Sequence, residues 1–213
     1  MSILSQGAAT GGQGAFIDIR TEPQRGGASL FAGPRRGLFE PVAPRAVAPI
    51  LGPRNARVAA LRDLIAKAEA GAKGYDAVQY GARIKTPRPP TQMTVAQIYD
   101  WIDATPGQPH AIGRYQFIPS TLRSLMARTG VDPQTRFSPA LQDRLADELL
   151  ADAGMARFLS GDLSQEGFMN NLAKIWAGLP NDTGKSHYHG YAGNKATMTW
   201  SYFHAAMERI FPS

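Results

Sequence analysis

Apolar residues recur at helical spacing in the segment that follows Asn55. They repeat every three to four positions, which is the spacing of one face of an amphipathic helix. Asn55 is a suitable N-cap for this helix, and Gly71 or Gly74 is suited to end it. The apolar positions are Val58, Leu61, Leu64, Ile65 and Ala68. The pattern therefore predicts a helix over residues 55–70.

Capping residues and apolar spacing predict further helices. Thr94 and Gln97 form a capping box at the start of one helix. Residues 119–129 form another, closed by Gly130, and Ser138 caps a third, which has proline in its first turn. Two more helices are expected. One buries Leu172, Ile175, Trp176 and Leu179. The other buries Trp200, Phe203, Met207 and Ile210.

Two short segments have the character of strands. Residues 74–85, GYDAVQYGARIK, alternate in part between apolar and polar side chains and predict a short strand or hairpin. Residues 113–117, GRYQF, read as a second strand. The sequence thus predicts an α+β domain that is mainly helical and contains one small β-sheet.

Residues 1–54 differ in composition from the rest of the chain. They contain nine glycines and six prolines, and their closely spaced prolines favour extended or polyproline II backbone. Apolar anchors occur at Phe16, Ile17, Leu30, Phe31, Leu38 and Phe39. We therefore divide the chain into an extended N-terminal docking arm, residues 1–54, and a domain, residues 55–213. A plain disordered tail is the alternative interpretation of the arm.

Charge and composition narrow the function classes. The formal net charge is +6, which favours an anionic partner such as nucleic acid, a membrane surface or a cell-wall polymer. Only Arg35-Arg36 forms a basic pair, and the arginines are not interleaved with aromatic residues, so we expect no nucleic-acid partner. The absence of cysteine excludes disulfide frameworks, thiolate metal sites and cysteine nucleophiles.

The sequence predicts neither a membrane span nor a signal peptide. No apolar run reaches the roughly 18–20 residues that cross a bilayer. The first residues, MSILSQGAATGGQG, lack the basic start and apolar stretch of a signal peptide. We therefore expect synthesis in the cytoplasm without a signal peptide.

Glu69 and Glu148 are the candidate catalytic acids. Glu69 lies at the margin of the apolar stripe of its predicted helix, two residues before a glycine. Partial burial raises the pKa of a carboxyl group, and a raised pKa suits a general acid near neutral pH. Glu148 lies close to the apolar face of its own predicted helix, so periodicity alone does not separate the two.

Four ordered segments, within residues 60–195, resemble the lambda-type phage endolysins. They are AEAGAKGYDAVQYG, AIGRYQF, FSPALQD and KIWAGLP. That family comprises lytic transglycosylases of lysozyme-like fold, which act on peptidoglycan. The resemblance implies a lysozyme-like domain that needs no cofactor and takes peptidoglycan glycan strands as its substrate.

The resemblance favours Glu69 over Glu148. The catalytic glutamate of the family lies at the end of the first domain helix, just before a glycine, and Glu69 occupies that position. The matching motifs imply that the substrate-binding residues are Tyr75, Asp76, Arg114, Tyr115, Gln116 and Trp176.

Each binding role has a structural alternative. Asp76 is also suited to a turn in which it binds its own backbone, and Tyr115 and Gln116 are also suited to packing in the sheet. Arg114 is suited to the carboxylates of the peptide stem or to an internal acid. His187 and His189 lack a third ligand nearby, so we expect a polar loop and no metal site.

Together these observations predict a lytic transglycosylase that cleaves the MurNAc–GlcNAc bond. The arm suggests a wall-piercing enzyme of the phage virion or tail, which acts in the host periplasm and binds other virion proteins through residues 1–54. The alternatives are a free endolysin, a hydrolytic muramidase, and a structural virion protein that has lost its activity.

Overall fold

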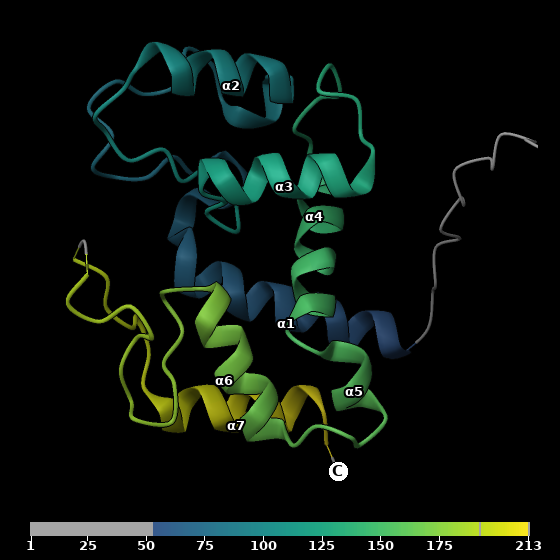
Figure 1. Cartoon of the computed structure of the whole chain (residues 1–213). Coiled ribbons are helices and arrows are strands. Elements are labelled where there is room, and N and C mark those ends of the chain that lie inside the picture. Colours follow the sequence, from purple (N-terminus) through teal and green to yellow (C-terminus); the bar gives the residue numbers. More distant parts are fainter. Residues whose placement is uncertain (1–52, 192, 213) are drawn as a thin grey trace, which may run out of the picture. The chain divides into compact units, whose positions relative to one another are not determined.

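The computed structural model describes residues 53–191 and 193–212, and this part of the chain is mainly helical (Figure 1). Residues 1–52 of the predicted arm lie outside the described residues. The α-helices are α1 (Pro53–Glu69), α2 (Val95–Ala104), α3 (Pro119–Thr129), α4 (Pro139–Asp152), α5 (Met155–Leu159), α6 (Gln165–Ile175) and α7 (Trp200–Ile210). Two short 3-10 helices are η1 (Gly71–Asp76) and η2 (Pro90–Gln92).

The predicted capping residues of α2, α3 and α4 are confirmed. Thr94 Oγ1 accepts the backbone N–H of Gln97 at 3.2 Å, and Gln97 Oε1 accepts that of Thr94 at 3.0 Å. Ser138 accepts a backbone N–H from the first turn of α4 at 3.3 Å. Gly130 ends α3 in the left-handed conformation, with φ of 63°. Local side-chain chemistry thus fixes where these helices begin and end.

Helix α1 begins earlier than predicted. It starts at Pro53, so the prediction of Asn55 as its N-cap is wrong, and proline at the start of a helix is favourable because its φ suits the first turn. The predicted apolar stripe is confirmed, since Leu61 and Ile65 are fully buried. The helix ends at Glu69, two residues before Gly71, whose φ is 55°.

The predicted β-sheet does not form in the described residues. Residues 74–85 and 113–117 make only isolated bridges, from Val78 to Ile112 and from Ile112 to Phe117. The second segment is instead a tight turn, in which Ile112 and Phe117 exchange backbone hydrogen bonds of 3.1 and 2.9 Å. The α+β prediction is therefore corrected to a mainly helical fold with isolated bridges.

Positive φ angles explain this correction. Gly113 has φ of 78° and Gln116 has φ of 47°, so the chain reverses within the segment that was predicted to extend. Gly71 and Gly74, with φ of 55° and 51°, coil the chain after α1 in the same way. Extended pairing over several residues is incompatible with these turns.

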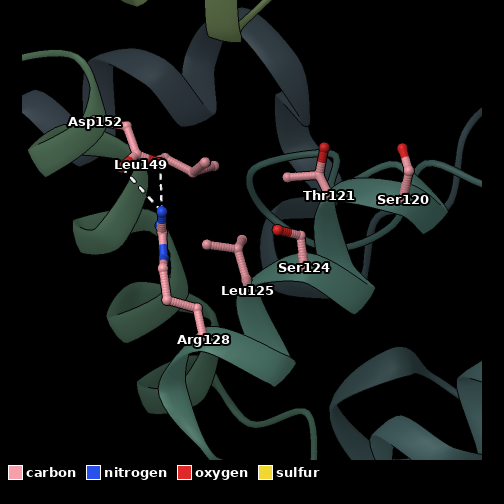
Figure 2. A pocket seen from close by; sticks show the side chains of 7 residues that line it. All are labelled: Ser120, Thr121, Ser124, Leu125, Arg128, Leu149 and Asp152. Carbon is pink, nitrogen blue, oxygen red and sulfur yellow. Dashed lines mark hydrogen bonds and ion pairs between the residues drawn. The ribbon is translucent and has the colours of Figure 1, made fainter.

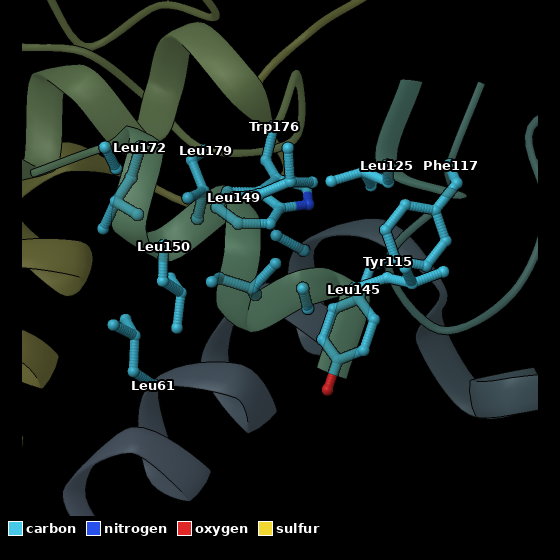
Figure 3. Close-up of a cluster of buried hydrophobic side chains, with 14 of the residues drawn as sticks. Leu61, Tyr115, Phe117, Leu125, Leu145, Leu149, Leu150, Leu172, Trp176 and Leu179 are labelled. Atoms are coloured by element: carbon cyan, nitrogen blue, oxygen red, sulfur yellow. The ribbon is translucent and has the colours of Figure 1, made fainter. Parts of the chain in front are cut away.

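The core joins α1, α4 and α6, as Figure 3 shows for Leu61, Leu145 and Leu172, which are all fully buried. Burying a leucine side chain contributes about 1.5–3 kcal/mol. Trp176 and Leu179 are also buried, but α6 ends at Ile175, so the prediction that they share its helical face is wrong. They enter the core from the turn that follows, in which the Leu179 N–H donates to the Trp176 carbonyl oxygen at 3.1 Å. Around this core α1 contacts α7, and α6 contacts both α5 and α7 (Figure 1).

Candidate active site

Glu69 is the last residue of α1 and continues its buried row. Leu61, Ile65 and Glu69 are spaced four residues apart, so they lie on the same side of the helix. Leu61 and Ile65 are fully buried, whereas Glu69 is partly exposed where the helix stops. Its carboxyl group therefore lies between the core and solvent, at the point where the chain turns into η1.

Burial raises the pKa of Glu69 from 4.5 to about 7. A hydrogen bond from the backbone N–H of Gly178 to Oε1, at 2.8 Å, acts in the opposite direction because it stabilises the carboxylate. The negative end of the α1 dipole also disfavours a carboxylate at this position. A carboxyl group with this pKa is available both as an acid and, after proton transfer, as a base near neutral pH.

Gly178 approaches the end of α1 too closely for any side chain. A Cβ atom at this position would lie 2.5 Å from the carbonyl oxygen of Ala68 and 3.0 Å from Glu69 Oε1. The residue type thus permits the hydrogen bond to Glu69. Sequence reasoning missed this partner, although the glycine two residues after Trp176, within the KIWAGLP segment, was an available signal.

Gln142 connects three of the sequence motifs. Its side chain is fully buried and donates to the carbonyl oxygens of Tyr75 and Phe137, at 3.0 and 3.1 Å. Its Oε1 accepts the backbone N–H of Arg114 at 2.8 Å. A Cβ on Gly113 would collide with this amide, so that glycine is required as well. Segments distant in sequence are thereby held together next to the first helix.

Asp143 gathers the tyrosines of two motifs. Its Oδ1 accepts the hydroxyl groups of Tyr75 at 2.9 Å and Tyr115 at 2.6 Å. Burial and the bond to Asp143 raise the pKa of both phenols, so both remain protonated donors. Arg62 lies 3.9 Å from the same carboxylate and forms a closer ion pair with Asp147 at 2.9 Å. Sequence reasoning missed the role of Asp143, although the Gln142-Asp143 pair belonged to a matching segment.

Arg114 forms an ion pair with an acid of its own chain, which is one of the two alternatives that the sequence left open. Its guanidinium group forms an ion pair with Asp63 and stacks over the ring of Tyr75, with 4.8 Å between Cζ and the ring centre. These contacts link the GRYQ turn to α1. They hold the guanidinium group toward α1 and Tyr75.

The other predicted binding residues differ in exposure. Asp76 is exposed, and its Oδ1 accepts the backbone N–H of Thr91 at 2.9 Å. Gln116 is partly exposed and donates through Nε2 to the carbonyl oxygen of Gly113 at 2.9 Å. Tyr115 and Trp176 are each only 2% exposed, so their rings present almost no surface to a ligand.

Two hollows occur elsewhere on the described domain. One, of about 250 Å³, lies between α3 and α4 beside the ion pair of Arg128 with Asp152 (Figure 2). The other, of about 590 Å³, lies between α1 and α7. Neither is lined by Glu69. Glu148 forms an exposed ion pair with Arg128 at 3.5 Å, so the two candidate acids have very different surroundings.

His187 and His189 are exposed in the loop after α6. Within the described residues, no group of three or more metal-ligating side chains is clustered. No helix of the described part of the chain has the length and apolar character needed to cross a membrane.

A protein-family model described as Endolysin matches residues 59–206, which is more than half of the chain. The chain belongs to the Endolysin family. The matched range of this endolysin contains Glu69, Gly178 and the residues around Gln142. No curated protein and no solved structure matches the chain. Membership identifies a phage enzyme that degrades the cell wall, with peptidoglycan as its substrate.

Proposed function

We propose that this endolysin is a lytic transglycosylase of lysozyme-like fold that cleaves the MurNAc–GlcNAc bond, with Glu69 as its acid and base. Glu69 donates its proton to the glycosidic oxygen as the bond from that oxygen to C1 of the muramyl sugar breaks. The resulting carboxylate then takes the proton of the sugar's own 6-hydroxyl, whose oxygen bonds to C1. The products are a 1,6-anhydro-muramyl end and a free hydroxyl on the departing sugar.

The surroundings of Glu69 carry this proposal. Burial raises the pKa of Glu69 to about 7 against the opposing effect of the bond from Gly178, without a contribution from another carboxylate of the described residues. A retaining or inverting hydrolase normally needs a second carboxylate across the scissile bond. The next acid after Glu69 along the chain, Asp76, accepts the backbone N–H of Thr91 at 2.9 Å. One isolated acid suits a reaction whose nucleophile is part of the substrate.

The predicted binding residues fit this site in two ways. Gln116 bonds to the Gly113 carbonyl through its amide nitrogen, so its amide oxygen is suited to the N–H of an acetamido group. We assign Tyr75, Asp76 and Arg114 to the glycan-binding wall of the site on the basis of their motifs. Tyr115 and Trp176 support that wall from the core because both rings are buried.

The test is the chemical nature of the product. Purified sacculi digested by the full chain are expected to release muropeptides without a reducing end, each one water lighter than the hydrolytic product. Mass spectrometry before and after borohydride reduction distinguishes the two, because only a reducing end gains hydrogen. Reducing muropeptides as the main product would show a muramidase instead.

We further propose that residues 1–54 dock the enzyme to other virion or tail proteins, because a freely released endolysin has no need for such an extension. Removal of residues 1–52, which ends just before α1, is the test. Activity on isolated walls should persist, whereas incorporation into phage particles should be lost. Normal packaging of the shortened chain would refute docking through residues 1–54, whereas absence of the full chain from phage particles would favour the free endolysin.

A further inference from the structure

Thr197 connects the two segments that meet at Glu69. Its Oγ1 lies 3.1 Å from the carbonyl oxygen of Ala68, the residue before Glu69 in α1. The same hydroxyl lies 3.1 Å from the carbonyl oxygen of Gly178, which also accepts the Thr197 backbone N–H at 2.9 Å. Gly178 in turn donates to the Glu69 carboxyl at 2.8 Å. One side chain thus bridges the end of α1 and the turn that binds the acid.

The hydroxyl is the part of Thr197 that reaches α1. Its backbone N–H holds only the Gly178 turn, whereas the side chain also contacts Ala68. The last carbonyl groups of a helix have no partner within the helix, so the Ala68 oxygen is open to an external donor. A Cβ on Gly178 would lie 2.5 Å from this same oxygen, which shows how closely the two backbones approach.

We propose that Thr197 is a positioning residue for cell-wall cleavage. Its hydroxyl holds the Gly178 turn against the last turn of α1, and this contact fixes the orientation in which the Glu69 carboxyl meets the glycosidic oxygen. The inference rests on the proposed role of Glu69 as the acid.

Loss of the hydroxyl has two consequences at Glu69. The turn moves away from α1, so the bond from Gly178 is weakened and water reaches the carboxyl group. Burial is the larger of the two influences on the pKa of Glu69, and its relief lowers that pKa toward 4.5. The acid is then both misoriented and deprotonated at a lower pH.

The experiment compares Thr197→Val and Thr197→Ser in the full chain, with soluble glycan strands as substrate. Valine keeps the branched shape and the backbone N–H but removes the hydroxyl. We expect a loss of about tenfold or more in kcat, because a displacement of about 1 Å can cost up to about 100-fold. KM should change by less than about twofold, since ground-state binding is not the affected step. The alkaline limb of the pH profile should move to lower pH, and serine should restore both kcat and the limb.

Thr183→Val is the matched control. Thr183 lies in the same loop, and its hydroxyl donates to Asn181 at 2.6 Å instead of to α1. This variant should retain wild-type kcat and pH dependence. If the Thr183 and Thr197 variants lose activity equally, the effect belongs to the loop in general and the proposal is wrong.

Glu69→Gln, measured in parallel, separates this inference from the proposed function. An inactive Glu69→Gln together with a fully active Thr197→Val would refute the role of Thr197 alone. An active Glu69→Gln would refute both. Circular dichroism and thermal unfolding check the fold of each variant. A Thr197→Val chain that fails to fold, with Thr197→Ala also unfolded, would make Thr197 a folding determinant and overturn the positioning role.

Discussion

Two carboxyl groups of the domain, Glu69 at the end of α1 and Asp143 in α4, have different surroundings. Asp143 accepts two tyrosine hydroxyl groups, at 2.9 and 2.6 Å, and lies 3.9 Å from Arg62. Glu69 accepts one backbone N–H, from Gly178, and burial raises its pKa to about 7. Asp143 is therefore well supplied with hydrogen-bond donors, and Glu69 is not.

In the proposed mechanism, this difference separates an acid that supports the structure from the acid that transfers the proton. Hydrogen bonds from protonated donors stabilise the charged form of a carboxylate, so Asp143 is suited to hold Tyr75 and Tyr115 in place. A desolvated carboxyl group with one neutral donor retains its proton to higher pH and is suited to transfer it. The proposal thus assigns different tasks to the two carboxyl groups because the fold provides them with different partners.

The largest expected effect is that of Glu69→Gln. The amide cannot donate a proton as an acid does, and general-acid catalysis contributes about 10²–10⁴ in rate, so lysis of sacculi should fall by about this factor. Zymograms and turbidity assays measure the loss. Glu148→Gln is the matched control, because Glu148 forms an exposed ion pair with Arg128 away from this site, and it should stay active.

The same substitution should not weaken the fold. Because the pKa of Glu69 is raised in the folded state, that state binds more protons than the unfolded chain between pH 4.5 and about 7. The free energy of unfolding therefore decreases as pH rises through this window, and Glu69→Gln should remove this decrease. Urea unfolding at pH 5 and pH 8 tests this. A variant clearly less stable than the wild type at pH 8 would contradict the interpretation of Glu69 as a strained acid.

The pH profile is the next way to test the comparison. If Glu69 acts as the acid, kcat/KM should fall above pH of about 7, by about tenfold per unit, as its proton is lost. Asp143→Asn retains an oxygen that accepts the tyrosine hydroxyls, so the alkaline limb should stay in place in this variant. An alkaline limb that moves in Asp143→Asn but not in Thr197→Val would assign the titration to Asp143 and its neighbours instead of Glu69, and would contradict the proposal.

Gln142→Leu tests the structural side of the comparison. The change leaves the Arg114 N–H and the Tyr75 and Phe137 carbonyls without their partner, and each buried unpaired group costs about 1–3 kcal/mol. We expect the free energy of unfolding to fall by about 3 kcal/mol. Gln134→Leu, on an exposed side chain, should change it little. Equal stabilities of the two variants would mean that the Gln142 network does not stabilise the fold.

The sequence predicted those features that depend on local chemistry. The capping box of Thr94 and Gln97, the Ser138 cap and the Gly130 stop are set by neighbours within a few residues. The buried row of α1 follows from periodicity, and it also indicated the position of Glu69. The predicted roles of the binding residues remain predictions.

Neither the absence of the β-sheet in the described residues nor the hydrogen-bond partners of Glu69 could be predicted from neighbouring residues in the sequence. Alternation around Tyr75 and in the GRYQF segment suggested strands, but the glycine and glutamine φ angles turn the chain instead. Gly178 reaches Glu69 across 109 residues of sequence, and Thr197 reaches Ala68 across 129. Contacts of this length depend on how helices pack, and spacing in one sequence does not determine them.

The smallest expected effect is that of Asp76→Asn, which distinguishes two mechanisms. The asparagine oxygen can still accept the Thr91 N–H, so the position of η2 should be retained and only the charge is lost. If the 6-hydroxyl of the sugar is the nucleophile, the loss in kcat should be at most about tenfold, far below that of Glu69→Gln. Anhydro-muropeptides should still dominate the digest.

A water nucleophile would give a different pattern. A second carboxylate would then have to activate the water or stabilise the cation, and Asp76, the next acid after Glu69 along the chain, would be the candidate. Its substitution would cost as much as that of Glu69, and the products would carry reducing ends. Thr91→Pro, which removes the N–H bound by Asp76 but not the carboxylate, separates the two contributions. If kcat falls as much in Thr91→Pro as in Asp76→Asn, the effect comes from the displacement of η2. If kcat falls only in Asp76→Asn, the effect comes from the lost charge.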